Sequence, residues 1–190
     1  MNDEPARPLD RFLAEYADFE EQVRETMDAL FGADCALCTA CCCRADICEE
    51  VLLSPFLSRL LDRQGFDERD FDDRYGWLDT GGCRLRCGRP PVCYAFFCGD
   101  LLGKAPDDEG RYVIEVLGML MDFVGREALD GTDLCEIRDP AALARLDFEA
   151  LSARLAIARR ALAAVHAYLQ SWRMTPPVRD ALAAIPLREI

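Results

Sequence analysis

The chain has 190 residues, a hydrophobic content of 51% that is ordinary for a globular protein, and a formal net charge of −13. That length is typical of a single domain and is enough to bury a hydrophobic core, so neither disulfides nor a metal is needed merely to fold it. The negative charge opposes binding to nucleic acid or to an acidic membrane surface, because polyanions repel it. We therefore expect no nucleic-acid partner and no membrane partner.

Eleven cysteines are the most unusual feature of the composition, and a disulfide framework is the first explanation to weigh. The sequence begins Met-Asn-Asp-Glu-Pro, which is acidic and lacks the apolar segment of a secretory signal. It also has no run of about 18 uncharged apolar residues that would span a membrane. We therefore expect a cytoplasmic chain, whose thiols stay reduced. The cysteines are clustered, and three are consecutive, which favours metal ligation over pairing.

The first predicted helix covers residues 8–31, where apolar side chains recur at steps of three and four. Gly32 is expected to end it, so that the first cysteines follow in a turn. A serine–proline pair at 54–55 predicts the N-cap and first turn of a helix that reaches about Gln64. The acidic stretch 67–80 is expected to be irregular or weakly helical.

The C-terminal region, residues 111–185, is predicted to be helical. Its expected segments are 111–129, a region that begins at Asp139-Pro140, a long helix from Asp147 to about Arg173, and a short helix at 178–185. The predicted fold class is therefore mainly α. We expect a single domain, 1–190, of helices with irregular cysteine-rich metal-binding loops in the region 32–100.

The first cysteine cluster reads Cys35-Ala36-Leu37-Cys38-Thr39-Ala40-Cys41-Cys42-Cys43 and is followed by Cys48. Two successive C-x-x-C steps put three thiolates on one short loop, which can surround a single soft metal or three corners of a cluster. Zinc takes four thiolates in tetrahedral geometry, and iron–sulfur clusters take cysteines in similar short runs. Thiolates disfavour magnesium, calcium and manganese, so the pattern predicts zinc or an iron–sulfur cluster.

The second cluster consists of four cysteines separated by three, five and four residues: Cys83, Cys87, Cys93 and Cys98. Three arginines lie within it: Arg84, Arg86 and Arg89. A four-thiolate zinc site, or an oxidised 4Fe–4S cluster with four thiolates, carries a charge of about −2. Guanidinium groups beside such a site offset that charge and tune its potential. The alternative is that these arginines form a solvated face of the protein.

The string C-x-x-C-x-x-C-C at residues 35–42 resembles the signature of the YkgJ-type cysteine cluster proteins, described as zinc- or iron-chelating or as containing an iron–sulfur cluster. The family's pattern R-P-x-x-C-x-x-F-x-C is similar to the residues Arg89, Pro90, Cys93, Phe96 and Cys98. The resemblance covers about residues 35–98 and implies eight metal-binding cysteines: Cys35, Cys38, Cys41, Cys42, Cys83, Cys87, Cys93 and Cys98. Three cysteines are left over: Cys43, Cys48 and Cys135.

The chain departs from the family in two places. Only Gly88 lies between Cys87 and the Arg-Pro pair, and Tyr94 and Phe97 stand where the family usually has arginine and proline. Because of these departures, Cys43 or Cys48 is an alternative ligand to Cys87. Eight thiols allow one four-cysteine site, two such sites or a larger shared cluster.

Two single residues have simpler interpretations. Cys135 stands alone in the sequence and is expected to be a small buried apolar side chain. His166 is the only histidine and lies in the predicted long helix, so we expect a surface or core residue rather than a ligand.

The sequence supports three functional hypotheses. The first is an iron–sulfur protein with a 4Fe–4S cluster held by both cysteine segments, acting in electron transfer, redox sensing or cluster handling with a protein redox or client partner. The second is an S-adenosylmethionine-dependent protein-lysine methylase, because a similar cysteine domain occurs in the flagellin lysine N-methylases; this rests on analogy alone. The third is a structural zinc module that supports protein interactions. The crowded cysteines and the family description favour iron.

Overall fold

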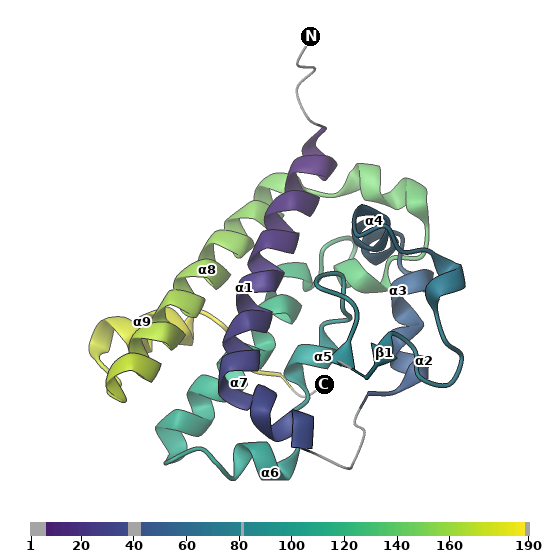
Figure 1. Ribbon diagram of the computed structural model, residues 1–190. Coiled ribbons are helices and arrows are strands. Elements are labelled where there is room, and N and C mark those ends of the chain that lie inside the picture. Colours follow the sequence, from purple (N-terminus) through teal and green to yellow (C-terminus); the bar gives the residue numbers. More distant parts are fainter. Residues whose placement is uncertain (1–6, 38–42, 81, 189–190) are drawn as a thin grey trace, which may run out of the picture.

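Two long helices, α1 (Pro8–Leu37) and α8 (Phe148–Ser171), lie side by side and form the scaffold of the fold (Figure 1). The computed structural model describes residues 7–37, 43–80 and 82–188. Helix α7 (Asp108–Gly125) packs against α8, and α9 (Pro176–Ala183) packs against α8 as well. The chain between α1 and α7 includes α4 (Pro55–Arg63), which packs against α1 as α8 does.

Short elements make up the segment between α1 and α7. They are α2 (Ala45–Cys48), α3 (Glu50–Leu53), α4 (Pro55–Arg63), the 3-10 helix η1 (Glu68–Asp70), β1 (Leu78–Asp79), β2 (Gly82–Cys83), α5 (Val92–Ala95) and α6 (Gly99–Leu102). The two strands pair antiparallel, with Leu78 opposite Cys83. Two further 3-10 helices, η2 (Leu134–Glu136) and η3 (Pro140–Arg145), connect α7 to α8. The predicted class, a mainly helical single domain, is confirmed.

Helix α1 buries the apolar stripe that predicted it, including Phe12, Tyr16 and Phe19. The rings of Phe12 and Tyr16 pack against Phe56 of α4, at centroid distances of 6.0 and 5.0 Å. Burial of such aromatic side chains supplies several kcal/mol, at about 25 cal/mol per Å² of apolar surface. The stripe therefore joins α1 to the segment that carries the cysteines.

The predicted end of this helix at Gly32 is wrong, because α1 continues to Leu37. Contacts on both sides of the glycine explain the extension. The ring of Phe31 packs on Phe97 at 5.6 Å, and Asp34 forms an ion pair with Lys104. Tertiary contacts thus outweigh the low helix propensity of glycine. Cys35 consequently stands on a helix and not in a turn.

The predicted helix starts are borne out by their caps. The Ser54 hydroxyl accepts a hydrogen bond from the Leu57 amide at 3.4 Å, and the Asp147 carboxylate accepts one from the Glu149 amide at 3.0 Å. The predicted helix 111–129 begins earlier, since Asp107 caps it through the Gly110 amide at 2.7 Å. No helix in the described ranges is long and apolar enough to cross a bilayer.

Candidate metal centre

The first cysteine segment is only partly visible in the structure. Cys35 is exposed on the last turn of α1, Cys43 is exposed before α2, and Cys48 is buried at the end of α2. The other three predicted ligands of this segment lie outside the described residues: Cys38, Cys41 and Cys42.

A buried tryptophan connects Cys48 to the second cysteine segment. The Trp77 indole nitrogen donates a hydrogen bond of 3.1 Å to the Cys48 carbonyl. The carbonyl of Trp77 accepts one of 2.8 Å from the amide of Arg84, the residue after Cys83. Phe71 packs edge-on against the indole at 5.5 Å. The side chain of Trp77 therefore binds Cys48, and its backbone binds the residue that follows the strand of Cys83.

The turn before this tryptophan touches Cys48 directly. Gly76 has a φ of +61°, and a Cβ atom there would lie 2.6 Å from the Cβ and 2.9 Å from the Sγ of Cys48. Real Cβ atoms do not approach other atoms so closely, and a positive φ also favours glycine. The sequence therefore needs glycine at this position for the turn to lie against Cys48.

Cys93, on α5, lies near the thiols of other cysteines. Loss of hydration raises the pKa of Cys93 to about 12, and the nearby charges of Cys48, Cys83 and, more weakly, Cys43 also raise it. The residue keeps exposed surface even though protein atoms crowd its thiol. We refer to Cys43, Cys48, Cys83 and Cys93 as the thiol cluster.

Of the three arginines singled out in the sequence, Arg89 interacts electrostatically with this cluster. Burial lowers the pKa of Arg89, but the neighbouring Tyr94, Cys83, Glu20 and Cys93 outweigh burial and raise it. Its Nε atom donates a hydrogen bond of 3.0 Å to the Leu85 carbonyl, which fixes the side chain.

The other two arginines have different surroundings. The guanidinium of Arg84 lies 4.8 Å from the centroid of the Phe66 ring and donates a hydrogen bond of 3.0 Å to the Asp70 carbonyl. Arg86 has an exposed side chain, while its backbone amide donates to the Gln64 Oε1 atom at 2.8 Å. Within the described residues, neither the Arg84 nor the Arg86 guanidinium forms a hydrogen bond to a residue of the thiol cluster.

Cys87 is buried in a different environment. Burial is the main cause that raises the pKa of its thiol, to about 12. The second largest cause is the negative charge of the Glu20 carboxylate. Its backbone is held by Gln64, whose Nε2 atom donates a hydrogen bond of 2.9 Å to the Cys87 carbonyl. The largest electrostatic interactions of the Cys87 thiol are therefore with charged side chains, Glu20 and Arg63 first among them.

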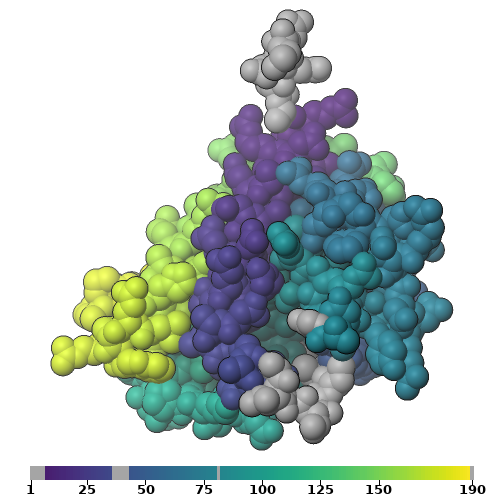
Figure 2. All heavy atoms as spheres, in the orientation of Figure 1, coloured from purple at the N-terminus to yellow at the C-terminus, as the bar shows by residue number. Residues whose placement is uncertain are grey.

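Cys98 and Cys35 lie on neighbouring segments. Cys98 is half-buried and precedes the first residue of α6. The Phe31–Phe97 ring contact and the Lys104–Asp34 ion pair hold α6 and its preceding residues against the end of α1. Figure 2 shows the lower end of α1 next to the teal segment of α6 on the molecular surface.

Sequence reasoning missed the buried residue that organises the second segment. Glu20 is fully buried on α1, and its carboxylate accepts hydrogen bonds from the amides of Gly88 (2.6 Å) and Arg89 (2.9 Å) and from the hydroxyl of Tyr94 (2.7 Å). Burial raises its pKa to about 7, although these hydrogen bonds act in the opposite direction. The sequence did contain a sign of this role: Glu20 follows Tyr16 by four positions and so lies on the same buried face of α1.

Two residues lie away from the thiol cluster. Cys135 is buried, as predicted, and faces the Tyr16 hydroxyl, which makes no hydrogen bond of normal geometry within the described residues. His166 is exposed, and its Nε2 atom lies 2.8 Å from the Thr26 hydroxyl, so it connects α8 to α1.

The donor chemistry of the thiol cluster suits a soft metal, because thiolates prefer zinc, copper(I) and iron–sulfur clusters. Within residues 7–37, 43–80 and 82–188, however, no group of three or more His, Cys, Asp and Glu side chains has the arrangement of a metal site. Comparison of the chain with protein-family models, with curated proteins and with solved structures gives no match. The resemblance to the cysteine cluster family therefore stays a prediction.

Proposed function

We propose that this chain is an iron–sulfur protein that acts in electron transfer, redox sensing or cluster handling, with a 4Fe–4S cluster held by cysteines of both segments. The observation that supports the proposal is the electrostatic interaction of Cys48 and Cys83 with Cys93. Cys48 ends α2 and Cys93 lies on α5, so this interaction links the first cysteine segment to the second.

The electrostatics of the thiol cluster support a bound metal. Ionisation of one thiol opposes ionisation of the next, and loss of hydration makes each negative charge more costly. Metal ligation requires deprotonated thiols, and a bound cation compensates their charges. Arg89 interacts electrostatically with Cys83 and Cys93, and its positive charge offsets part of the thiolate charge.

The same contacts favour one of the alternative ligand sets. Cys48 interacts electrostatically with Cys93, whereas the largest charge interaction of Cys87 is with Glu20. We therefore propose Cys48 in place of Cys87, together with Cys83, Cys93 and cysteines of the C-x-x-C-x-x-C-C motif. When bound, an iron–sulfur cluster supplies one-electron redox chemistry, and zinc in the same donor set supplies structure alone.

The test is anaerobic purification, followed by the visible absorption spectrum and by counting iron, zinc and acid-labile sulfide per chain. A brown protein with iron and sulfide in equal amounts is expected. A colourless protein with stoichiometric zinc and no sulfide would overturn the redox function and leave a structural zinc module.

Serine substitutions identify the ligands. Cys48→Ser, Cys83→Ser and Cys93→Ser are expected to lower iron content to less than half, because a lost thiolate ligand destabilises the cluster. Cys135→Ser is the matched control, since Cys135 is a buried cysteine away from the thiol cluster and its iron content is expected to be unchanged. Loss of iron in Cys87→Ser with retention in Cys48→Ser would reverse the proposed ligand choice.

A further inference from the structure

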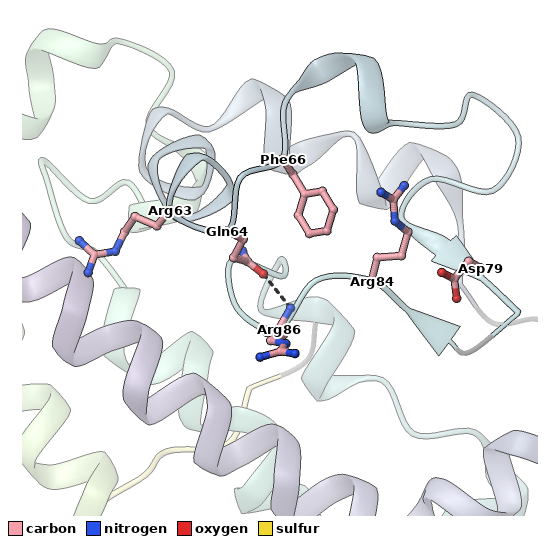
Figure 3. A pocket seen from close by; sticks show the side chains of 6 residues that line it. All are labelled: Arg63, Gln64, Phe66, Asp79, Arg84 and Arg86. Atoms are coloured by element: carbon pink, nitrogen blue, oxygen red, sulfur yellow. Dashed lines mark hydrogen bonds between the residues drawn. The ribbon is translucent and has the colours of Figure 1, made fainter.

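Two arginines meet on one buried carboxylate of α7. The Asp122 side chain is 5% exposed, and it accepts hydrogen bonds from Arg126, one turn further along the helix, at 2.5 Å, and from Arg188, which follows α9. Arginines do not converge in this way at the pocket beside β1 and β2, where three guanidinium groups point in different directions (Figure 3): those of Arg63, Arg84 and Arg86. A buried charge is costly unless it is paired, so Asp122 favours holding both of its arginines.

The segment that contains Arg188 is held at several points. Arg188 also donates a hydrogen bond to the Oδ2 atom of Asp133. The Nη2 atom of Arg126 donates one of 3.2 Å to the carbonyl of Pro186, and Ile185 before it is buried. We refer to the segment from Pro186 to Arg188 as the strap, since it runs back from α9 across the molecule (Figure 1).

The strap is connected to a strained turn after α7. Glu127 and Asp130 have φ angles of +47° and +51°, in the left-handed region that residues other than glycine rarely adopt. The Oδ1 atom of Asp133 accepts a hydrogen bond of 2.7 Å from the Glu127 amide, while its Oδ2 atom accepts one from Arg188. Strained backbone persists only where the surrounding contacts fix it, and it is common in switch regions. One carboxylate therefore joins the strained turn to the strap.

The carboxylates that hold the strap also interact with a buried thiol. Cys135 lies on η2, and burial raises the pKa of its thiol well above the ordinary value. The negative charges of Glu20 and, more weakly, of Asp133 and Asp122 raise it further, whereas a hydrogen bond with Tyr16 acts in the opposite direction. Almost no thiolate is therefore present while this region is closed, and the thiolate is the reactive form. Reaction of Cys135 thus reports whether the region is open.

We propose that the strap is a releasable closure: when Arg188 leaves Asp122 and Asp133, the region between α7 and η2 opens to solvent while the scaffold of α1 and α8 stays folded. Release leaves Asp122 paired with Arg126, so its buried charge is not abandoned. Release also exposes little additional apolar surface, because Leu187 is already 42% exposed and the Arg188 side chain 40%. Segments with few buried apolar contacts open locally at low cost. This closure does not depend on the metal.

The test is alkylation of Cys135 by iodoacetamide in the purified 190-residue protein, followed at that peptide by mass spectrometry. Arg188→Gln, and a chain that ends at Ile185, are each expected to be labelled at Cys135 about tenfold faster than the wild type or more, because the open form is more populated. Arg179→Gln is the matched control, since Arg179 also joins α9 to α7, through an exposed ion pair with Glu109. Its labelling rate is expected to be unchanged. Unchanged labelling in both strap variants, or equal acceleration in Arg179→Gln, would overturn the proposal.

Urea separates local opening from a general loss of stability, which would also speed the labelling. Local opening exposes little surface, so the labelling rates of the strap variants are expected to change little at urea concentrations well below the unfolding transition. Global unfolding exposes the whole core, and its contribution rises steeply with urea. A steep rise from the lowest urea concentrations would mean that Cys135 reacts only in the unfolded chain, and would also overturn the proposal.

Discussion

The carboxylate of Glu20 accepts a hydrogen bond of 2.7 Å from the hydroxyl of Tyr94, and this contact joins the long helix α1 to the short helix that carries Cys93. The same carboxylate binds the backbone amides of Gly88 and Arg89. One side chain on the scaffold therefore fixes both the loop after Cys87 and the helix of Cys93. Local helix propensity cannot do this, since α5 has only four residues.

Substitution Glu20→Gln tests this fixing role. An amide offers one acceptor oxygen and brings two donors, so at least one of the three donors at this site loses its partner. We expect unfolding free energy to fall by about 2 kcal/mol, the usual cost of an unsatisfied buried donor. Iron content is also expected to fall, because Cys93 is less firmly held. Urea unfolding and metal analysis measure the two effects.

Two variants serve as comparisons. Tyr94→Phe removes one of the three donors to Glu20 and is expected to cost about 1 kcal/mol. Glu25→Gln changes an exposed carboxylate on the same helix and is expected to change stability by less than about 0.5 kcal/mol. If Glu20→Gln proved as mild as Glu25→Gln, the carboxylate would have no structural role.

The raised pKa of Glu20 predicts a pH dependence of stability. Burial raises this pKa to about 7 from an ordinary value of 4.5. Between these values the folded protein keeps a proton that the unfolded chain has lost, so stability falls as pH rises. The contribution is complete below pH 4.5 and is lost as pH passes 7. The contribution amounts to at most about 3 to 4 kcal/mol, since a pKa difference of one corresponds to about 1.4 kcal/mol.

The measurement is urea unfolding from pH 4.5 to 8 with a reductant and a chelator present, for the wild type and for Glu20→Gln. Other carboxylates titrate in both proteins, so the difference between the two curves isolates Glu20. That difference is expected to shrink as pH rises toward 7. A difference that stays constant with pH would show that Glu20 keeps an ordinary pKa.

The helices were predictable from the sequence because their determinants are local. The apolar stripe of α1 and the caps Ser54 and Asp147 each involve residues within a few positions of one another. The end of α1 was not predictable, because Phe97 packs on Phe31 from 66 positions away and Lys104 pairs with Asp34 from 70 positions away. These contacts depend on the fold and not on local propensity.

The candidate site was predictable in its residue types and less so in its arrangement. Spacing alone identified the two cysteine segments. The family resemblance counted Cys87 among the ligands, with Cys43 or Cys48 as the alternative, and the choice between them stays a prediction. The surroundings of Cys48 and Cys87 depend on Trp77, Gln64 and Glu20, which interact with these two residues from more than 20 positions away in the sequence. No pattern within either cysteine segment encodes those contacts.

Gly118 controls how closely α5 approaches α7. A Cβ atom at Gly118 would lie 2.6 Å from the Phe97 ring and 3.0 Å from the Tyr94 carbonyl. We expect Gly118→Ala to destabilise the protein by about 1 to 3 kcal/mol, because overpacking outweighs the better helix propensity of alanine. The displaced α5 is also expected to lower iron content.

Gly32→Ala is the matched control, measured by the same thermal and urea unfolding. Gly32 also lies inside a helix, but a Cβ atom there would meet only the Asp28 Cβ, at 3.8 Å. Its substitution is therefore expected to stabilise the protein by up to about 1 kcal/mol. Equal effects of the two substitutions would mean that α5 does not depend on close packing at Gly118.

Gly76→Ala tests whether the turn before Trp77 must touch Cys48. This substitution adds a Cβ atom 2.6 Å from the Cβ of Cys48 and also forces alanine into a positive φ. Gly65→Ala separates the two effects, because Gly65 has a φ of +78° and open space around it. We expect about 1 kcal/mol of destabilisation from Gly65→Ala, and about 3 kcal/mol from Gly76→Ala because steric overlap is added to backbone strain.

Metal content distinguishes a local effect of Gly76 from a general loss of stability. Gly76→Ala pushes on Cys48, so it is expected to lower iron per folded chain, whereas Gly65→Ala is expected to leave that ratio unchanged. Iron and folded protein are measured on the same anaerobic samples, by metal analysis and circular dichroism. Normal iron content in Gly76→Ala would mean that Cys48 is not a ligand, and Cys43 or Cys87 would then be the remaining candidates beside Cys83 and Cys93.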